Sequence, residues 1–288
     1  MRRAALLPAL LLVVPLLVAC GDDGGGSGRR SYDRYVALGD SFTSGAGTAQ
    51  PVARSGKCQR TRLNYPTLVS KELHAELVDV SCGGASTANL TTPQDKGDGS
   101  SAPPQLDAVT SATDLVTVGL GYNDQSWFAG LVFGCTTLAA SDPTGRPCQD
   151  AAAANPDPEA VAGQIGAQVE AGLEAVRARA PDAELLLVGY PQLVPAEGRC
   201  DDLAIADGDY PYVRAMLELL DDQLRKAAEA AGATYVDVLA ASAGHDVCAG
   251  DDAWVNGATP LPGVAATYHP FARGQQAVAE LVVAALED

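Results

Sequence analysis

Four short segments of the chain carry the groups that nucleophilic acyl transfer requires. Ser41 follows one apolar run, and Gly83 and Gly84 follow a second. Asn123 follows a third run, and His269 lies just before the last helix-like stretch. A serine hydroxyl activated by an imidazole base is a nucleophile. Backbone N–H groups and a side-chain amide can hold the oxyanion that forms during acyl transfer. These residue types, in this order, predict a serine-dependent reaction.

Each segment also has an ordinary structural explanation. Gly39 and Asp40 suit a tight turn that caps a helix, and Gly83 and Gly84 let the chain turn after a strand. An asparagine after a strand often braces a turn, and a histidine before a helix is often a surface residue. The four segments together favour the chemical interpretation, because turn chemistry does not require them to recur after successive strands.

The elements that must position these residues follow an alternating pattern. Apolar, β-branched runs alternate with helix-like stretches, which predicts a three-layer α/β/α fold with a central parallel sheet of about five strands. The carboxyl ends of parallel strands share one edge of the sheet, where such folds bind ligands. The expected strands are 34–38, 75–82, 113–120, 183–190 and 233–238, and the expected helices are 65–74, 157–180, 212–231 and 272–287.

Two long segments interrupt this pattern. Residues 91–105 and 128–155 are rich in Gly, Pro, Ser or Thr, and we expect them to be loops outside the core. Long loops on an α/β domain often bind ligands or act as lids.

The composition indicates one domain. With 288 residues, 47% of them hydrophobic, the chain can bury one sizeable core. Its 19 basic and 36 acidic residues give a net charge of −17, which opposes binding to nucleic acid or to anionic lipid headgroups. No nucleotide-binding glycine motif follows an expected strand, so we expect no cofactor. We expect a monomer.

The N-terminus predicts export. Two arginines precede an apolar run that has the form of a secretory signal over 1–19 and is short for a membrane span. The run ends in "LVAC", which resembles a bacterial lipobox, so the resemblance implies that Cys20 is acylated. Residues 20–31 form a Gly-rich tether ahead of a domain over 32–288. We expect the protein on the outer face of the bacterial cytoplasmic membrane, with an ordinary signal or a single span as alternatives.

The cysteines indicate disulfides rather than a metal site. Of the seven cysteines, Cys20 is set aside for the lipid, which leaves six. An even number in an exported chain favours disulfides, although six cysteines allow fifteen pairings. No CxxC motif occurs, and the chain has 3 histidines, so we expect no metal. Beyond Cys20, the cysteines are Cys58, Cys82, Cys135, Cys148, Cys200 and Cys248, and the histidines are His74, His245 and His269.

Taken together, the four segments resemble the sequence blocks of the SGNH or GDSL hydrolases. "GDSF", "CGGAS", "GYND" and "YHP" resemble its successive blocks, and the resemblance runs from about Tyr35 to the C-terminus. It is greatest to secreted, disulfide-containing lipases and esterases of actinobacteria, which also share phrases such as "GYPQLVP". The resemblance implies a flavodoxin-like fold and hydrolysis of small-molecule or lipid esters.

The resemblance also implies a role for each site residue. Ser41 takes the position of the nucleophile and His269 that of the base. Ser41 and Gly84 would supply backbone oxyanion donors, with Gly83 as the second choice, and Asn123 would supply a side-chain donor. Members of this group pair their cysteines in sequence order, which implies Cys58 with Cys82, Cys135 with Cys148, and Cys200 with Cys248.

One position departs from the family pattern. Many members have an aspartate three residues before the histidine, where this chain has Ala266. We therefore expect the backbone carbonyl of Ala266 to orient His269. Asp246, Asp251 or Asp252 remain alternatives, because a loop could bring a carboxylate to the ring.

Other functions remain open. The same family includes carbohydrate acetylesterases and acyltransferases, so an envelope sugar-ester deacetylase is one alternative. A solute-binding lipoprotein without chemistry is another, because such proteins carry similar tethers. Those proteins usually have two lobes, whereas this chain has one run of expected strands.

Overall fold

The structure is a computed structural model that describes Met1, residues 31–154 and residues 157–287. The chain divides into two units, Met1–Arg30 and Ser31–Asp288. The signal sequence expected over 1–19, the expected lipidation site Cys20 and most of the expected tether lie outside the described residues. No helix in the described ranges has the length and hydropathy needed to cross a membrane.

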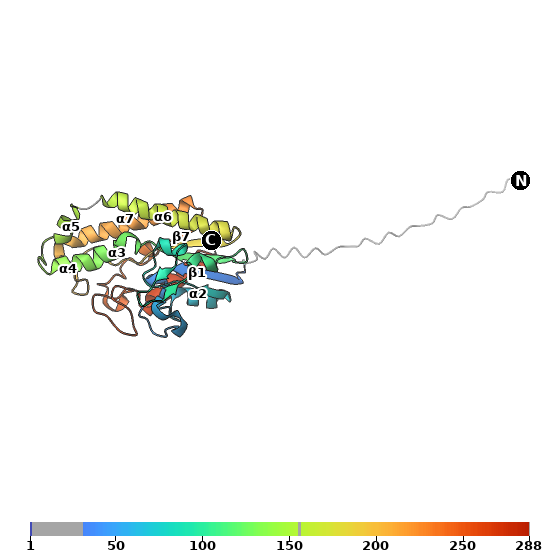
Figure 1. Cartoon of the computed structure of the whole chain (residues 1–288), viewed down its shortest axis with the longest axis horizontal. Coiled ribbons are helices and arrows are strands. Elements are labelled where there is room, and N and C mark those ends of the chain that lie inside the picture. Colours follow the sequence, from blue (N-terminus) through green and yellow to red (C-terminus); the bar gives the residue numbers. More distant parts are fainter. Residues whose placement is uncertain (2–30, 155–156, 288) are drawn as a thin grey trace. The chain divides into compact units, whose positions relative to one another are not determined.

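The second unit contains the expected parallel sheet (Figure 1). All five strands are parallel, in the order β2-β1-β5-β6-β7. Each expected strand is confirmed, with ends that differ by a few residues. The strands are β1 Arg34–Gly39, β2 Glu76–Asp79, β5 Leu115–Gly119, β6 Glu184–Val188 and β7 Thr234–Val236.

Helices cover both faces of this sheet. On one face α2 (Tyr65–Leu73) packs with α9 (Ala272–Ala284), and on the other α6 (Pro158–Arg179) packs with α7 (Tyr210–Ala230). Successive side chains of a strand point to opposite faces. Accordingly, Val36 and Leu38 of β1 belong to the core beside α6 and α7, whereas Tyr35 and Ala37 belong to the core beside α2 and α9. The three-layer α/β/α fold is confirmed.

The segment over 91–105 is largely irregular but contains a short hairpin. Strand β3 (Gln94–Asp95) pairs antiparallel with β4 (Ser101–Ala102). The side chains of Gln94 and Gln105 are buried, so this segment contributes to the interior at two points.

The expectation that 128–155 lies outside the core is wrong. Much of the segment is helical, in α3 (Trp127–Ala129), a π-helical turn η5 (Gly130–Gly134), α4 (Cys135–Ala139) and α5 (Pro147–Ala152). The core beside α6 and α7 includes Phe128, Leu131, Val132, Cys135 and Cys148. Tertiary packing and a disulfide override the weak helical propensity of its Gly and Thr residues.

The remaining elements are short. They are α1 Ser41–Ser44, η1 Ala53–Cys58, η2 Thr87–Leu90, η3 Gln105–Ala108, η4 Asp124–Ser126, η6 Asp207–Asp209, α8 Val238–Ala241 and η7 Gly250–Asp252. The three disulfides implied by the family resemblance are present: Cys58–Cys82, Cys135–Cys148 and Cys200–Cys248.

Candidate active site

Ser41 lies at the carboxyl end of β1, as the first residue of α1. Asp40 caps this helix, because its Oδ1 accepts a hydrogen bond from the N–H of Phe42 at 2.8 Å. The turn leaves no room for a side chain at Gly39, where a Cβ atom would lie 2.1 Å from Thr43 Oγ1. The glycine and the aspartate of the "GDS" segment therefore build the turn that presents Ser41.

His269 lies next to Ser41, although 228 residues separate them in the sequence. The His269 Nε2 to Ser41 Oγ distance is 2.8 Å, which is within hydrogen-bond range. The histidine follows Tyr268, whose φ of 56° turns the chain through the left-handed conformation. Burial lowers the pKa of His269, and a hydrogen bond to a backbone carbonyl opposes that shift. The ring is therefore kept neutral, as a base requires.

The carbonyl beside His269 belongs to Thr267, which corrects the expectation for Ala266. His269 Nδ1 lies 2.7 Å from the Thr267 oxygen. The Ala266 oxygen instead accepts hydrogen bonds from the His269 N–H at 3.1 Å and from Asn256 Nδ2 at 3.1 Å. Because the Ala266 oxygen is already occupied by these two donors, the next carbonyl along the chain meets the ring.

The loop aspartates make other contacts. The Asp246 carboxylate accepts a hydrogen bond from the N–H of Cys248 at 2.8 Å. Asp251 and Asp252 belong to the short helix η7, and the Asp252 backbone oxygen lies 2.8 Å from His245 Nδ1. In the described part of the chain, no carboxylate forms an ion pair with His269.

We therefore predict that Asp246→Asn, Asp251→Asn and Asp252→Asn each retain near wild-type turnover of a nitrophenyl ester. The physical reason is that none of these carboxylates contacts the ring. Removing a true triad acid costs on the order of 10⁴-fold in turnover. A loss of that size in one variant would identify its aspartate as the acid and would contradict the assignment to Thr267. Ala266→Gly, which keeps both carbonyls, serves as the matched control.

Gly84 has the free backbone amide that sequence reasoning could not distinguish from that of Gly83. The N–H of Gly83 donates to the Cys58 oxygen at 3.0 Å, whereas the N–H of Gly84 has no acceptor in the described part of the protein. The φ of Gly84 is 78°, a conformation that favours glycine.

Two side chains hold the peptide that joins these glycines. Gln94 Nε2 and Lys96 Nζ donate to the Gly83 oxygen at 3.0 and 2.9 Å. The C=O and N–H of a trans peptide point in opposite directions, so these contacts direct the N–H of Gly84 to the other side. Sequence reasoning missed Gln94 and Lys96, because both lie in a segment that reads as a loop.

Asn123 lies in the loop after β5, with three residues between it and the end of the strand. Its Nδ2 donates to the Ala85 oxygen at 2.9 Å, and an amide nitrogen has a second proton to donate. The neighbouring Asp124 accepts hydrogen bonds from the N–H of Thr87 at 3.1 and 3.2 Å and from the Thr87 hydroxyl. These contacts join the loops after β2 and β5, so the segments of Gly84 and Asn123 are held together.

Two buried glutamines brace the nucleophile turn and were also missed. Gln105 Oε1 accepts from the N–H of Gly39 at 2.7 Å, and its Nε2 donates to the Gly39 oxygen at 2.9 Å. Gln275 Nε2 donates to the Phe42 oxygen at 2.7 Å, and its Oε1 accepts from the N–H of Tyr65 at the same distance. No local sequence signal marks either residue, because each acts on backbone far away in the chain.

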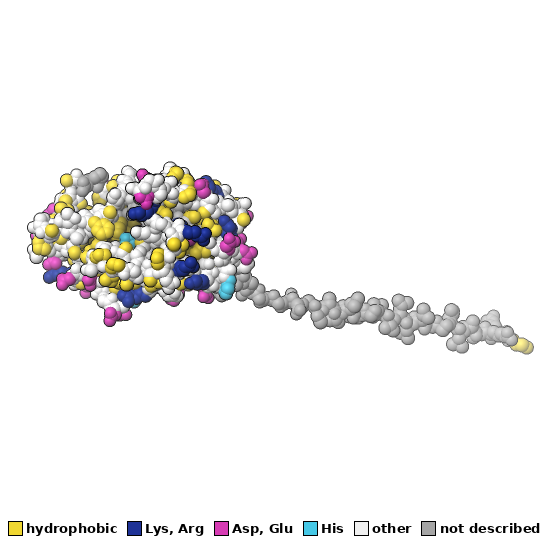
Figure 2. Space-filling view, turned by 60° about the horizontal axis from the view of Figure 1, so that its bottom comes forward, with side chains coloured by type: hydrophobic (Ala, Val, Ile, Leu, Met, Phe, Trp, Pro, Cys, Tyr) yellow, Lys and Arg dark blue, Asp and Glu magenta, His cyan; other side chains and the backbone are white. Residues whose placement is uncertain are grey.

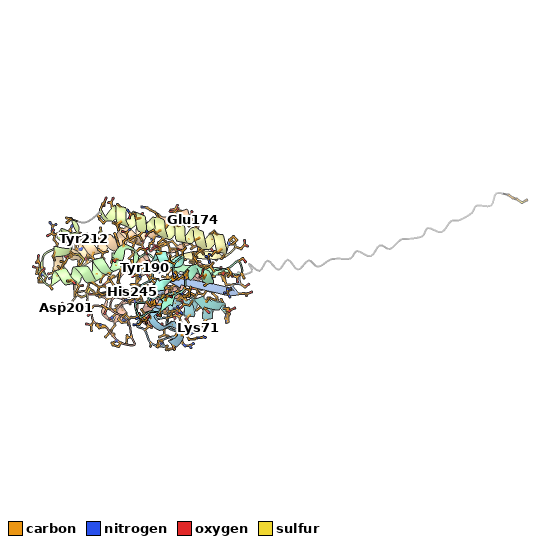
Figure 3. The ribbon with its side chains drawn as sticks, viewed as in Figure 1. Lys71, Glu174, Tyr190, Asp201, Tyr212 and His245 are labelled. Carbon is orange, nitrogen blue, oxygen red and sulfur yellow. A yellow bond between two sulfur atoms is a disulfide. The ribbon has the colours of Figure 1, made fainter. Side chains whose placement is uncertain are left out.

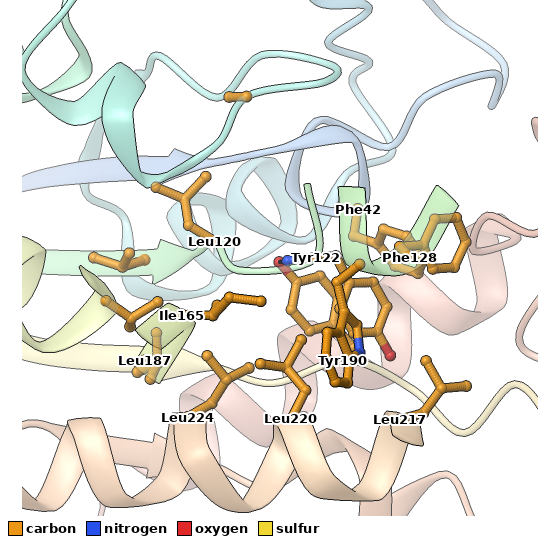
Figure 4. Close-up of a cluster of buried hydrophobic side chains, with 14 of the residues drawn as sticks. Phe42, Leu120, Tyr122, Phe128, Ile165, Leu187, Tyr190, Leu217, Leu220 and Leu224 are labelled. Atoms are coloured by element: carbon orange, nitrogen blue, oxygen red, sulfur yellow. Dashed lines mark hydrogen bonds between the residues drawn. The ribbon is translucent and has the colours of Figure 1, made fainter. Parts of the chain in front are cut away.

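Aromatic rings surround the Ser41–His269 pair. Phe42 makes edge contacts with Tyr122, Phe128 and Tyr190 (Figure 4). The centroid of its ring lies 4.9 Å from that of His269. The leucines of α7 lie beneath this cluster. Beyond Phe128, the ring of Phe133 is 43% exposed. The rings of Phe42, Tyr122, Phe128 and Tyr190 are therefore part of the core, and Phe133 is the exposed member of the aromatic cluster.

Asp40 belongs to a buried hydrogen-bond chain. The hydroxyl of Tyr190 donates to Asp40 Oδ2 at 2.7 Å and lies 3.3 Å from the N–H of Tyr122, which donates to it. Burial raises the pKa of Asp40 to about 7, against the hydrogen bonds from Tyr190 and Phe42. This series of hydrogen bonds links the turn of Ser41 to the loops after β5 and β6.

This raised pKa predicts a pH-dependent stability. The folded protein keeps the Asp40 proton up to about pH 7, whereas the unfolded chain releases it near pH 4 (roughly, for a free aspartate). Stability from Asp40 is therefore present at low pH and is lost as the pH rises to 7. Asp40→Asn cannot lose this stability. Its melting temperature, measured relative to wild type, should therefore rise between pH 4 and pH 8, whereas that of the exposed control Asp201→Asn should stay at a constant difference from wild type. A difference for Asp40→Asn that is also independent of pH would contradict the prediction.

The protein has a three-layer α/β/α fold with a serine–histidine pair at the carboxyl edge of its sheet. These two features define its structural class. A family model agrees with it: residues 37–277 match that of the GDSL-like Lipase/Acylhydrolase family. The chain belongs to this family and is a carboxylic ester hydrolase.

Characterised relatives agree with this assignment. The chain is 40% identical over 255 residues to Lipase 2 of Streptomyces coelicolor, covering 85% of this chain and 83% of that protein. It superposes on an extracellular lipase of Streptomyces rimosus with a TM-score of 0.74 and 29% identity, over 88% of this chain and 99% of the other. For phospholipase A1 of Streptomyces albidoflavus the TM-score is 0.69 and the identity 26%, with the same coverage.

Proposed function

We propose that this protein is a lipase or esterase that cleaves acyl esters through a Ser41 acyl-enzyme. The observation that carries the proposal is the 2.8 Å contact between Ser41 Oγ and His269 Nε2. His269 removes the Ser41 proton as the oxygen attacks the ester carbonyl. It then gives that proton to the leaving alcohol. In the second half, His269 activates a water molecule that releases the acid and restores the free serine.

The developing oxyanion accepts hydrogen bonds from three donors in this proposal. They are the backbone N–H groups of Ser41 and Gly84 and the side-chain amide of Asn123. The free N–H of Gly84 and the second Nδ2 proton of Asn123 support this assignment. Such donors act most strongly where water is excluded, because the local dielectric is low.

The Thr267 carbonyl fixes the orientation of the imidazole. His269 Nδ1–H donates to this oxygen, which leaves Nε2 as the acceptor toward Ser41. A neutral carbonyl stabilises the imidazolium less than a carboxylate does. Burial of His269, which lowers its pKa, acts in the same direction.

The acyl group is proposed to lie against Phe133, whose exposed ring is next to Phe128 and Tyr268, close to His269. The exposed ring of Phe133 favours an acyl chain over a polar sugar. The family assignment and the single large sheet of the described residues speak against a solute-binding protein.

A chain-length profile with nitrophenyl esters tests this choice. A lipase or esterase with an apolar acyl site should show a higher kcat/KM for butyrate to octanoate than for acetate. The reason is that each buried methylene contributes about 0.8 kcal/mol. A profile that falls sharply beyond acetate would instead identify a sugar-ester deacetylase, and acyl transfer to added alcohols would identify an acyltransferase.

We propose further that the protein is exported and held at the outer face of the cytoplasmic membrane. The signal over 1–19, acylation of Cys20 and the tether over 20–31 would place the domain over 32–288 beside the envelope. The extracellular location of the Streptomyces rimosus lipase supports export. Palmitate incorporation into the wild type, and its absence in Cys20→Ser, tests the anchor; equal labelling of both would overturn it.

A further inference from the structure

Basic side chains gather around one cavity, although the whole chain has a net charge of −17. A cavity of about 380 Å³ lies between η1 and the β3–β4 hairpin. We call it the basic pocket, because Arg54, Lys57, Arg60 and Lys96 line it. Figure 2 shows Lys and Arg side chains at several places on the visible face, interspersed with Asp and Glu.

The cations of the basic pocket interact with nearby acids only at a distance: Asp98 with Lys57 and Lys96, and Asp79 with Arg60. No described carboxylate forms an ion pair with any of the four cations. Asp107 also lines the cavity, but its carboxylate pairs with Arg179 at 3.6 Å. Burial lowers the pKa of Lys96, the carboxylate of Asp98 opposes this shift, and the like charge of Lys57 adds to it. An anion in the cavity would pair directly with Arg54 and Lys57, which form no ion pair with a described carboxylate.

The walls of the basic pocket are held in position. The Cys58–Cys82 disulfide ties η1 to the segment after β2. Arg60 Nη1 donates to the Ser81 oxygen at 2.8 Å, and Lys96 Nζ donates to the Gly83 oxygen at 2.9 Å. Arg54 and Lys57 are exposed and have no hydrogen-bond acceptor among the described residues. Two cations are thus anchored, and two are available to a ligand.

The polar lining suits a phosphate group. Ser55, Ser100 and Ser101 line the same cavity; the hydroxyls of Ser55 and Ser100 donate to the Val52 oxygen and to Asp98 Oδ1, and that of Ser101 makes no hydrogen bond with the described residues. Guanidinium groups bind phosphate oxygens through paired hydrogen bonds, and lysines add point charges. The overall negative charge of the protein does not prevent this, because salt screens charges beyond about 10 Å.

We propose that the basic pocket binds a phosphate group, either of a substrate headgroup or of free phosphate. As a headgroup site it rests on the proposed ester hydrolysis and makes phosphate-bearing esters the preferred substrate class. Lys96 connects the two sites, because it lines the pocket and donates to the Gly83 oxygen, which belongs to the same peptide group as the Gly84 N–H. The headgroup would then lie on one side of this peptide and the reacting ester on the other.

A titration of the full-length protein with inorganic phosphate tests the pocket itself. The test variant is the double substitution Arg54→Gln and Lys57→Gln, which removes two exposed cations and leaves Lys96 in contact with Gly83. Lys71→Gln removes an exposed lysine of α2 that does not line the pocket, and it is the matched control (Figure 3). Wild type and control should bind phosphate, and the double variant should bind about tenfold more weakly. Equal affinity of all three, or no binding to wild type, would overturn the proposal.

Kinetics distinguish the two sources of phosphate. The kcat/KM for lysophosphatidylglycerol is divided by that for a monoacylglycerol of the same acyl chain. For a headgroup site this ratio should fall about tenfold in the double variant and stay constant in Lys71→Gln. A constant ratio with weakened phosphate binding would assign the pocket to free phosphate. If no ester is turned over, the proposed hydrolysis is wrong. The titration still tests whether the basic pocket binds phosphate, because it does not depend on turnover.

Discussion

Ser41→Ala should lower the turnover of nitrophenyl butyrate on the order of 10⁶-fold, because it removes the attacking oxygen. The hydrogen bond to His269 is lost with the hydroxyl, but the turn itself should persist. Asp40 and Gln105 hold the turn through the backbone of Phe42 and Gly39. The variant should therefore fold and melt near the wild-type temperature. A fluorophosphonate probe should label the wild type at Ser41 and leave the variant unlabelled.

An exposed serine supplies the control for this result. Ser111→Ala changes the same functional group far from the turn and should retain both turnover and labelling. Residual turnover in Ser41→Ala above about 10⁻³ of the wild-type value would show that another group carries the attack, because loss of a nucleophile leaves far less. Labelling at a different serine would identify that group directly.

Asn123→Ala should lower kcat about 10²- to 10³-fold while KM changes little, because the lost donor acts mainly on the oxyanion. The substitution also removes the hydrogen bond from Nδ2 to the Ala85 oxygen. The loop keeps a second anchor, since Asp124 holds Thr87 through backbone and side-chain contacts. The affinity of a boronic acid that mimics the tetrahedral intermediate should fall by a similar factor.

The neighbouring amide is the matched control for Asn123. Gln125→Ala removes an exposed side chain that donates to Gln164 Oε1 at 3.0 Å, and it should leave kcat and boronate affinity unaltered. If Asn123→Ala raised KM with kcat unchanged, Asn123 would bind substrate without stabilising the oxyanion. Wild-type kcat in Asn123→Ala would contradict the proposed oxyanion hole.

Much of the fold could be predicted because its signals are local. The strands β1, β5 and β6 are buried on both faces and appear as continuous apolar runs. The long helices α6 and α7 have helical spacing along their whole length. The segment over 128–155 was wrongly expected to lie outside the core, because its buried residues are separated by glycines and polar side chains and are brought together only by packing and the Cys135–Cys148 disulfide.

The residues that brace the site could not be predicted in the same way. Gln105 and Gln275 act on the backbone of Gly39 and Phe42, with 66 and 233 residues between partners. Such contacts depend on which loops meet after folding and leave no periodic pattern in the sequence. For the same reason, the sequence could not predict which carbonyl lies beside His269. Every residue has a backbone carbonyl, and the type of its side chain does not reveal where that carbonyl points.

By itself, the sequence determined the order of strands and helices along the chain and the identity of the chemical groups at the strand ends. Those features depend on side-chain type and local periodicity. Only the tertiary structure decided that Ser41 and His269 meet, that the amide of Gly84 rather than that of Gly83 is free, and that Thr267 faces the ring. These outcomes depend on backbone direction and on contacts between distant segments, which are set only when the whole domain packs.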